Sequence, residues 1–89
     1  MDKKIQKILE EKICESTNVK DEITMLVNSL VAHDNDKNTV GYGIIIGRLY
    51  NSFYYQSRRI LKRDPTKQEF SEFVKFLKKR ENKLSQILT

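Results

Sequence analysis

Several residue types that carry particular chemistries are scarce in this 89-residue chain. It has one cysteine, one histidine, one proline, three glycines and no tryptophan. A single cysteine, Cys14, excludes an internal disulfide and fits a reducing compartment such as the cytoplasm. One histidine and one cysteine give no spacing typical of a zinc site. We therefore expect no metal and no cofactor.

Long hydrophobic runs are also missing. The least polar stretch, residues 40–47, is far shorter than the roughly 20 residues that cross a membrane. The start of the chain, Met1-Asp2-Lys3-Lys4, leads into a charged segment rather than an apolar one, so no signal peptide is predicted. We expect no membrane span and a cytoplasmic location.

Residues suited to catalysis are few. His33 lies near a predicted helix end, where the helix dipole favours a histidine for structural reasons. Residues 34–38 resemble the first half of a calcium loop, but Thr39 and Ile45 occupy the positions that require glycine and glutamate. No pair of carboxylates is spaced for acid–base chemistry. The sequence therefore predicts a protein that is not an enzyme.

Helical periodicity is what the chain has in abundance. Apolar residues recur three and four positions apart, and no stretch alternates with the period of two that strands need. A length of 89 residues suits one domain. We predict a single all-α domain over residues 1–89: a small four-helix bundle with antiparallel neighbours and long third and fourth helices.

Boundary residues define the first two predicted helices. The first runs from about Asp2, which caps it, to Glu15. The second begins after Asn18, which resembles a cap, and ends near His33; the polar residues 34–38 then form a loop. The residues that these helices are expected to bury are Ile5, Ile8, Leu9, Ile13, Val19, Ile23, Leu26, Val27, Leu30 and Val31.

Proline separates the third and fourth predicted helices. The third runs from Thr39 to Arg63 and ends before Pro65, which pushes its preceding residue out of the helical region. The fourth starts at a capping box formed by Thr66 and Glu69 and runs to about Leu88. Their expected apolar faces consist of Tyr42, Ile46, Leu49, Tyr50, Phe53, Ile60 and Leu61 in the third helix and Phe70, Phe73, Val74, Leu77, Leu84 and Leu88 in the fourth.

Charge is distributed unevenly along the chain. Residues 1–38 hold six Lys/Arg and eight Asp/Glu, a balance of −2, whereas residues 39–89 hold eleven and four, a balance of +7. Such asymmetry indicates a basic surface that suits nucleic acid, anionic lipid or an acidic protein. The alternative interpretation is a charged surface that serves only solubility.

A basic stripe on the third predicted helix is the main candidate site. It consists of Arg48, Ser52, Tyr55, Arg59 and Lys62, which project outward, opposite the apolar face. Arginine forks bind phosphates, and a tyrosine in their midst can stack on an exposed base. With flanking and fourth-helix residues, the candidates for nucleic-acid or anion binding are Arg48, Tyr55, Arg58, Arg59, Lys62, Arg63, Lys75 and Lys79. The alternative is a solvated face whose side-chain stems cover apolar groups.

A second candidate surface surrounds Gly43 and Gly47. Two glycines one helical turn apart let another backbone approach closely, which favours a tight crossing with the second or fourth helix. A homodimer seam is the alternative, and Ile44 and Ile45 would join it because they point away from the main core face. Phe76 is either an exposed anchor for a partner or part of a wide apolar face.

Two functions fit these patterns. The first is a non-enzymatic binding module that uses its basic surface on a polyanion, such as a nucleic acid bound chiefly through its phosphates. The second is a protein–protein interaction module, such as an adaptor, a regulator or an immunity-type protein. That module would be homodimeric or would bind an acidic protein.

Overall fold

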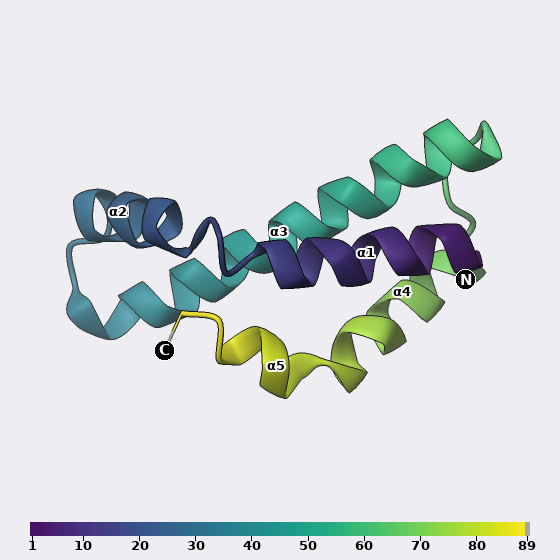
Figure 1. The fold of residues 1–89 in the computed structure, drawn as a ribbon. Helices are drawn as coiled ribbons and strands as arrows, with labels where there is room; N and C mark the ends of the chain where they lie inside the picture. The colour runs from purple at the N-terminus through teal and green to yellow at the C-terminus, as the bar shows by residue number, and fades with distance from the viewer. Residues whose placement is uncertain (89) are drawn as a thin grey trace.

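The computed structural model describes residues 1–88 and is all-α over that range (Figure 1). It confirms the predicted all-α class, and no helix among these residues has both the length and the apolar character needed to cross a membrane. The helices are α1 (Lys3–Glu15), α2 (Lys20–Leu30), α3 (Asp34–Leu61), α4 (Lys67–Lys79) and α5 (Glu81–Ser85).

Helix α3 is the axis of the molecule. Its 28 residues extend along the longest dimension, 40 Å, and α1, α2 and α5 all pack against it. In Figure 1, α1 runs opposite to α3, and α4 and α5 return in the direction of α1. The N-terminus therefore lies beside α4, where the Met1 ammonium pairs with the Glu72 carboxylate.

The core is one apolar cluster along the inner side of α3. Ile45, Leu49 and Phe53 of α3 are fully buried, and Phe53 stacks on Phe73 of α4 with ring centroids 4.4 Å apart. Burying a side chain of this size stabilises the fold by about 1.5–3 kcal/mol. The other buried members are Ile5, Leu9, Ile13, Ile23, Val27, Phe76, Leu84 and Ile87.

The predicted caps of the first and fourth helices are confirmed. The Asp2 carboxylate accepts hydrogen bonds from the backbone N–H groups of Lys4 and Ile5. At the start of α4, the Thr66 hydroxyl accepts from the Glu69 N–H and the Glu69 carboxylate accepts from the Thr66 N–H, which completes the capping box. Each cap satisfies N–H groups that the helix itself leaves unpaired.

Two predicted boundaries around α3 are wrong. Residues 34–38 form its first turn rather than a loop, because Asp34 and Asp36 suit the positive end of the helix dipole and Lys37 pairs with Asp34 at 2.9 Å. The helix ends at Leu61, and Lys62 adopts a left-handed conformation with φ 62°. Lys62 and the residue after it therefore follow the helix instead of belonging to it.

Helix α2 also differs from its prediction. It starts after Val19 without a side-chain cap, so Asn18 is not the cap, and it ends at Leu30 instead of His33. Leu26 and Leu30, which were expected in the core, are exposed. The reason is that α2 packs on α3 through one side only, that of its two buried residues.

The predicted fourth helix is split in two. Arg80, with φ −112° and ψ 13°, interrupts it and separates α4 from α5. This bend turns Leu84 and Ile87 into the core, whereas Val74, expected to be buried, is exposed. Phe76 takes its place in the core, so the interpretation of Phe76 as part of a wide apolar face is the correct one.

The close helix crossing predicted at the glycine pair is not found. A Cβ at Gly43 or Gly47 would meet nothing within 4 Å, whereas one at Gly41 would collide with the Leu88 side chain. Ile45 is fully buried and Ile44 packs against the core, so the expectation that both point away from it is wrong. Gly43 and Gly47, which flank these isoleucines in the sequence, thus lie on open surface.

Candidate functional site

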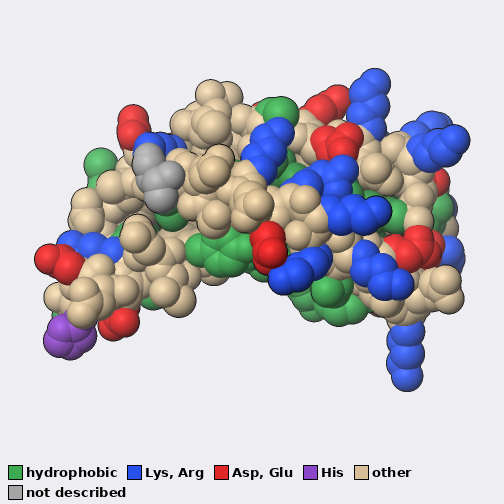
Figure 2. Space-filling view, turned by 90° about the horizontal axis from the view of Figure 1, so that it is seen from below, with side chains coloured by type: hydrophobic (Ala, Val, Ile, Leu, Met, Phe, Trp, Pro, Cys, Tyr) green, Lys and Arg blue, Asp and Glu red, His purple; other side chains and the backbone are tan. Residues whose placement is uncertain are grey.

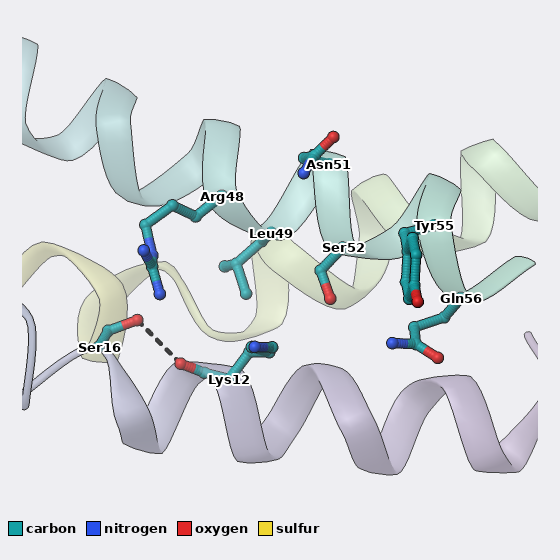
Figure 3. Close-up of a pocket in the computed structure, with 8 residues that line it drawn as sticks. All are labelled: Lys12, Ser16, Arg48, Leu49, Asn51, Ser52, Tyr55 and Gln56. Atoms are coloured by element: carbon teal, nitrogen blue, oxygen red, sulfur yellow. Dashed lines mark hydrogen bonds between the residues drawn. The ribbon is translucent and has the colours of Figure 1, made fainter.

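The basic stripe of α3 faces a neighbouring helix. Helix α1 lies along this side of α3, and the stripe forms one wall of a groove between the two, which we call the α1–α3 groove (Figure 3). Arg48, Tyr55 and Arg59 remain exposed at its rim. Ser52 does not point outward as predicted: it is only 9% exposed and lies at the floor.

One hollow of the groove lies near the C-terminal end of α1. It has a volume of about 260 Å³ and contains the predicted stripe residue Tyr55, so we call it the Tyr55 hollow. In Figure 3, Arg48 and Lys12 reach into the gap from α3 and α1 respectively. Most of its lining residues carry polar groups, and the lining comprises Lys12, Ser16, Arg48, Leu49, Asn51, Ser52, Tyr55 and Gln56.

A second hollow lies further along the same pair of helices, near the N-terminal end of α1. Its volume is about 520 Å³, and we call it the lysine hollow. Four cations line it against a single carboxylate, that of Glu11. Its lining comprises Lys4, Lys7, Ile8, Glu11, Arg59, Ile60 and Lys62.

The α1 lysines of this groove are functional candidates that the sequence analysis missed. Lys4, Lys7 and Lys12 belong to residues 1–38, whose net charge is −2. The charge distribution along the sequence therefore did not indicate a basic surface there. The sequence did contain a signal for two of them. Lys4 and Lys12 each lie four residues from Ile8, so the three side chains share one side of the helix. What the sequence did not indicate was that this flank adjoins the stripe.

Two predicted cations form ion pairs outside the groove. Arg58 Nε donates to the Asp64 carboxylate at 2.6 Å, and this hydrogen bond raises the pKa of Arg58. Arg63 donates to both oxygens of Glu69, and its hydrogen bond, with that of the Thr66 backbone, lowers the pKa of Glu69 to about 2. Arg63 thereby braces the loop before α4, and the charges of both arginines are offset locally.

The remaining stripe cations keep their charge unpaired. Arg59 donates from Nε to the Gln56 side-chain carbonyl at 2.9 Å, a neutral acceptor. Within residues 1–88, Arg48 and Lys62 make no hydrogen bond or ion pair through their side chains. These three cations are therefore free to meet an anion.

Lys75 and Lys79 lie on α4 and are exposed, but neither lines the Tyr55 hollow or the lysine hollow. Figure 2 shows the side of the molecule that carries α4 and α5, where blue cationic side chains gather over one half with red carboxylates among them. These two lysines thus lie outside both hollows of the groove.

The predicted interface residues differ in whether they are accessible to a partner. Phe76 is 5% exposed, and the Arg80 guanidinium covers it, 3.7 Å above the ring centroid. Gly43 and Gly47 form an open strip of α3, with exposed Val40 and Tyr50 along it. The strip is the part of the predicted interface that is accessible.

An exposed apolar group on α2 was not predicted. Met25 and Leu30 are 71% and 78% exposed, and Leu26 lies between them. Together with Glu22 and Ser29 they line a shallow depression. The sequence pattern assigned two of these side chains to the core because it cannot tell how much of an apolar face a neighbour covers.

Comparison with protein-family models, with curated proteins and with solved structures finds no match to this chain. Within residues 1–88, no three His, Cys, Asp or Glu side chains converge in a way that could hold a metal ion.

Proposed function

We propose that this protein is a non-enzymatic, cytoplasmic binding module that holds a nucleic acid in the α1–α3 groove, chiefly through phosphates. The observation that carries this proposal is the convergence of six cations, from α1, from α3 and from the residue that ends α3, with only Glu11 among the lining acids. The six cations are Lys4, Lys7, Lys12, Arg48, Arg59 and Lys62.

The linear arrangement of these cations favours a linear partner. Arg48 and Lys62 are fourteen positions apart, which corresponds to about 21 Å of helix. Cations spread over this length match the repeated phosphates of a strand better than a single small anion. Each phosphate contact would release counterions and so make binding dependent on salt.

We interpret the fold that presents the groove as a four-helix bundle whose fourth member, α4 with α5, is broken at Arg80. Support comes from contacts that hold this member against the other helices: Phe73 stacks on Phe53, and Arg80 pairs with Glu10 of α1. No residue of α4 or α5 lines either hollow of the groove.

Fluorescence anisotropy with a labelled single strand and a labelled duplex, DNA and RNA, tests the proposal. Binding should weaken steeply as salt rises. The double variant Lys7→Gln/Lys62→Gln should bind at least tenfold more weakly at low salt, and its slope of log K against log salt should be shallower by about 1.4 for single strands. Absence of measurable binding to all four probes at low salt would refute the proposal.

A matched control comes from α4. The double variant Lys75→Gln/Lys79→Gln loses the same charge from a surface outside the groove. It should change the affinity by less than about threefold, the residual long-range effect of net charge. Equal losses in the two double variants would show that net charge, and not the groove, carries the binding.

A protein–protein interaction module remains the second candidate, favoured by the open strip at Gly43 and Gly47. A second copy could bring its own α3 close to these glycines and form a homodimer, and an acidic protein is the other candidate partner. Sedimentation at rising concentration tests self-association. A dimer that Gly47→Leu abolishes would support the homodimer, and a monomer at every concentration would exclude it.

A further inference from the structure

We propose that the Tyr55 hollow is a pocket for one unstacked nucleotide of a single strand. In this pocket Arg48 and Lys12 hold the phosphate, and the base stacks on the Tyr55 ring. The inference rests on the proposed function and narrows it, since it commits the groove to single-stranded nucleic acid.

The phosphate position follows from the two cations. Arg48 has no hydrogen-bond or ion-pair partner within the described chain, and its side chain extends across the gap toward α1. Lys12 lines the same hollow from the opposite helix and is held only by an exposed pair with Glu15 at 3.6 Å. Such a surface pair is weak, so a phosphate can replace the Glu15 carboxylate. A guanidinium fork and an ammonium group together form a common phosphate-binding set.

The base position follows from Tyr55. Its side chain is 60% exposed, although neighbouring aromatic residues of α3 pack against other rings, such as Tyr50 on Tyr54 and Phe53 on Phe73. In Figure 3 the Tyr55 ring stands at one end of the hollow, seen edge-on, with one face turned toward Ser52, and the Arg48 guanidinium lies toward the other end. An unpaired aromatic face beside cations is the arrangement that single-strand binders use for stacking.

Ser52 supplies an independent observation. Its hydroxyl is the buried side-chain oxygen that has no hydrogen-bond partner within residues 1–88, and Figure 3 places it at the floor, between Arg48 and Tyr55. A buried polar group without a partner destabilises the fold, so it calls for an explanation. A polar edge of a base stacked on Tyr55 would supply this missing partner.

The size of the hollow favours a single strand over a duplex. Its volume of about 260 Å³ is on the scale of one small group rather than of a stretch of duplex. In a duplex the faces of the bases are stacked on one another, so none is accessible to Tyr55. The pocket therefore requires a base that has left the stack.

Two Tyr55 variants test the base position. Wild-type protein should bind a single strand at least tenfold more tightly than a duplex of the same sequence. Tyr55→Ala should lose about tenfold for the single strand and nothing for the duplex, whereas Tyr55→Phe, which keeps the ring, should bind like the wild type. Far-ultraviolet circular dichroism checks that both variants remain folded.

A nuclear magnetic resonance titration with a nucleoside 5′-monophosphate, and separately with inorganic phosphate, locates the ligand. The nucleotide should shift the signals of Arg48, Ser52 and Tyr55, and Arg48→Gln should weaken this binding. If both ligands shift Arg48 and neither shifts Tyr55, the hollow is an anion site only and the inference fails.

The outcomes separate this inference from the proposed function. Equal affinity for single strand and duplex, with no effect of Tyr55→Ala, would overturn the nucleotide pocket but leave the groove as a phosphate-binding surface. Absence of binding to every nucleic acid would overturn both.

Discussion

Gly43 and Gly47 cost helical stability without serving a contact in the monomer. Because a Cβ at either position meets nothing within 4 Å, Gly43→Ala and Gly47→Ala should each raise the free energy of unfolding by about 0.5–1 kcal/mol. Urea denaturation followed by circular dichroism measures the change. Gly41→Ala is the contrast, since its Cβ would collide with Leu88 and should give a smaller gain or a loss. A loss at the two open positions would indicate that this strip is covered in solution.

Glu69 makes the stability of the chain sensitive to acid. Its pKa is lowered from 4.5 to about 2, first by the hydrogen bond from Arg63 and then by that from the Thr66 backbone. The ionised form therefore stabilises the fold above pH 4.5, and this contribution is lost as the pH falls from 4.5 toward 2. Glu69→Gln keeps a capping-box side chain but removes the charge, so its unfolding free energy should fall less across that range. Parallel pH profiles for wild type and variant would contradict the assignment.

Ser52 should be replaceable with a gain in stability. Its unpartnered buried hydroxyl carries a desolvation penalty, and alanine is the better helix former. Ser52→Ala should raise the free energy of unfolding by about 1 kcal/mol, measured by urea titration. A decrease would mean that the hydroxyl has a partner in solution.

At the scale of elements, the corner between α4 and α5 depends on Arg80. Its guanidinium covers the Phe76 ring, donates to the Phe76 carbonyl at 3.1 Å and pairs with Glu10 of α1. Arg80→Ala exposes Phe76 and disconnects the corner from α1, so it should cost about 1–2 kcal/mol. Thermal unfolding measures this loss, and Lys79→Ala, on the exposed side of α4, should have little effect. Equal effects of the two variants would deny Arg80 this bracing role.

Helix boundaries could be predicted where the signal is local. The Asp2 cap and the Thr66–Glu69 box are made by side chains within three residues of the groups they bind, so the sequence contained all the information. The start of α3 was mispredicted because residues 34–38 have loop-forming side chains, whose helical state depends on the dipole and on the packed helix that follows. The break at Arg80 was not predicted either, and there the side chain pairs with Glu10 of α1, a residue distant in sequence.

At the scale of the whole molecule, unpaired cations crowd the α1–α3 groove. Their mutual repulsion opposes folding, and salt screens it, since the Debye length falls below about 10 Å above 0.1 M. Raising NaCl from about 20 mM to about 300 mM should therefore raise the unfolding temperature by a few degrees. Lys7→Gln/Lys62→Gln removes two of these charges and should show a weaker salt response. A salt-independent wild type would show that the groove cations do not repel one another appreciably.

About half of the candidate site could be predicted from the sequence. Arg48, Tyr55, Arg59 and Lys62 belong to one flank of the third helix by periodicity alone, and they line the groove. The opposite wall was not predicted, because periodicity relates residues of one helix and says nothing about which flank of another helix lies beside them. Arg63 was predicted to bind an anion because periodicity within one helix could not show that its charge pairs with Glu69 of the next helix.

The sequence by itself determined the helical class, both side-chain caps and the positions of cations around the axis of α3. Each of these depends on residues within a turn or two of one another, so local physical chemistry suffices. The tertiary structure alone decided that the lysines of α1 meet the stripe, that Ser52 is buried and that the apolar residues of α2 are left exposed. These outcomes depend on how separate helices interdigitate, and that geometry is set by contacts between segments far apart in the chain.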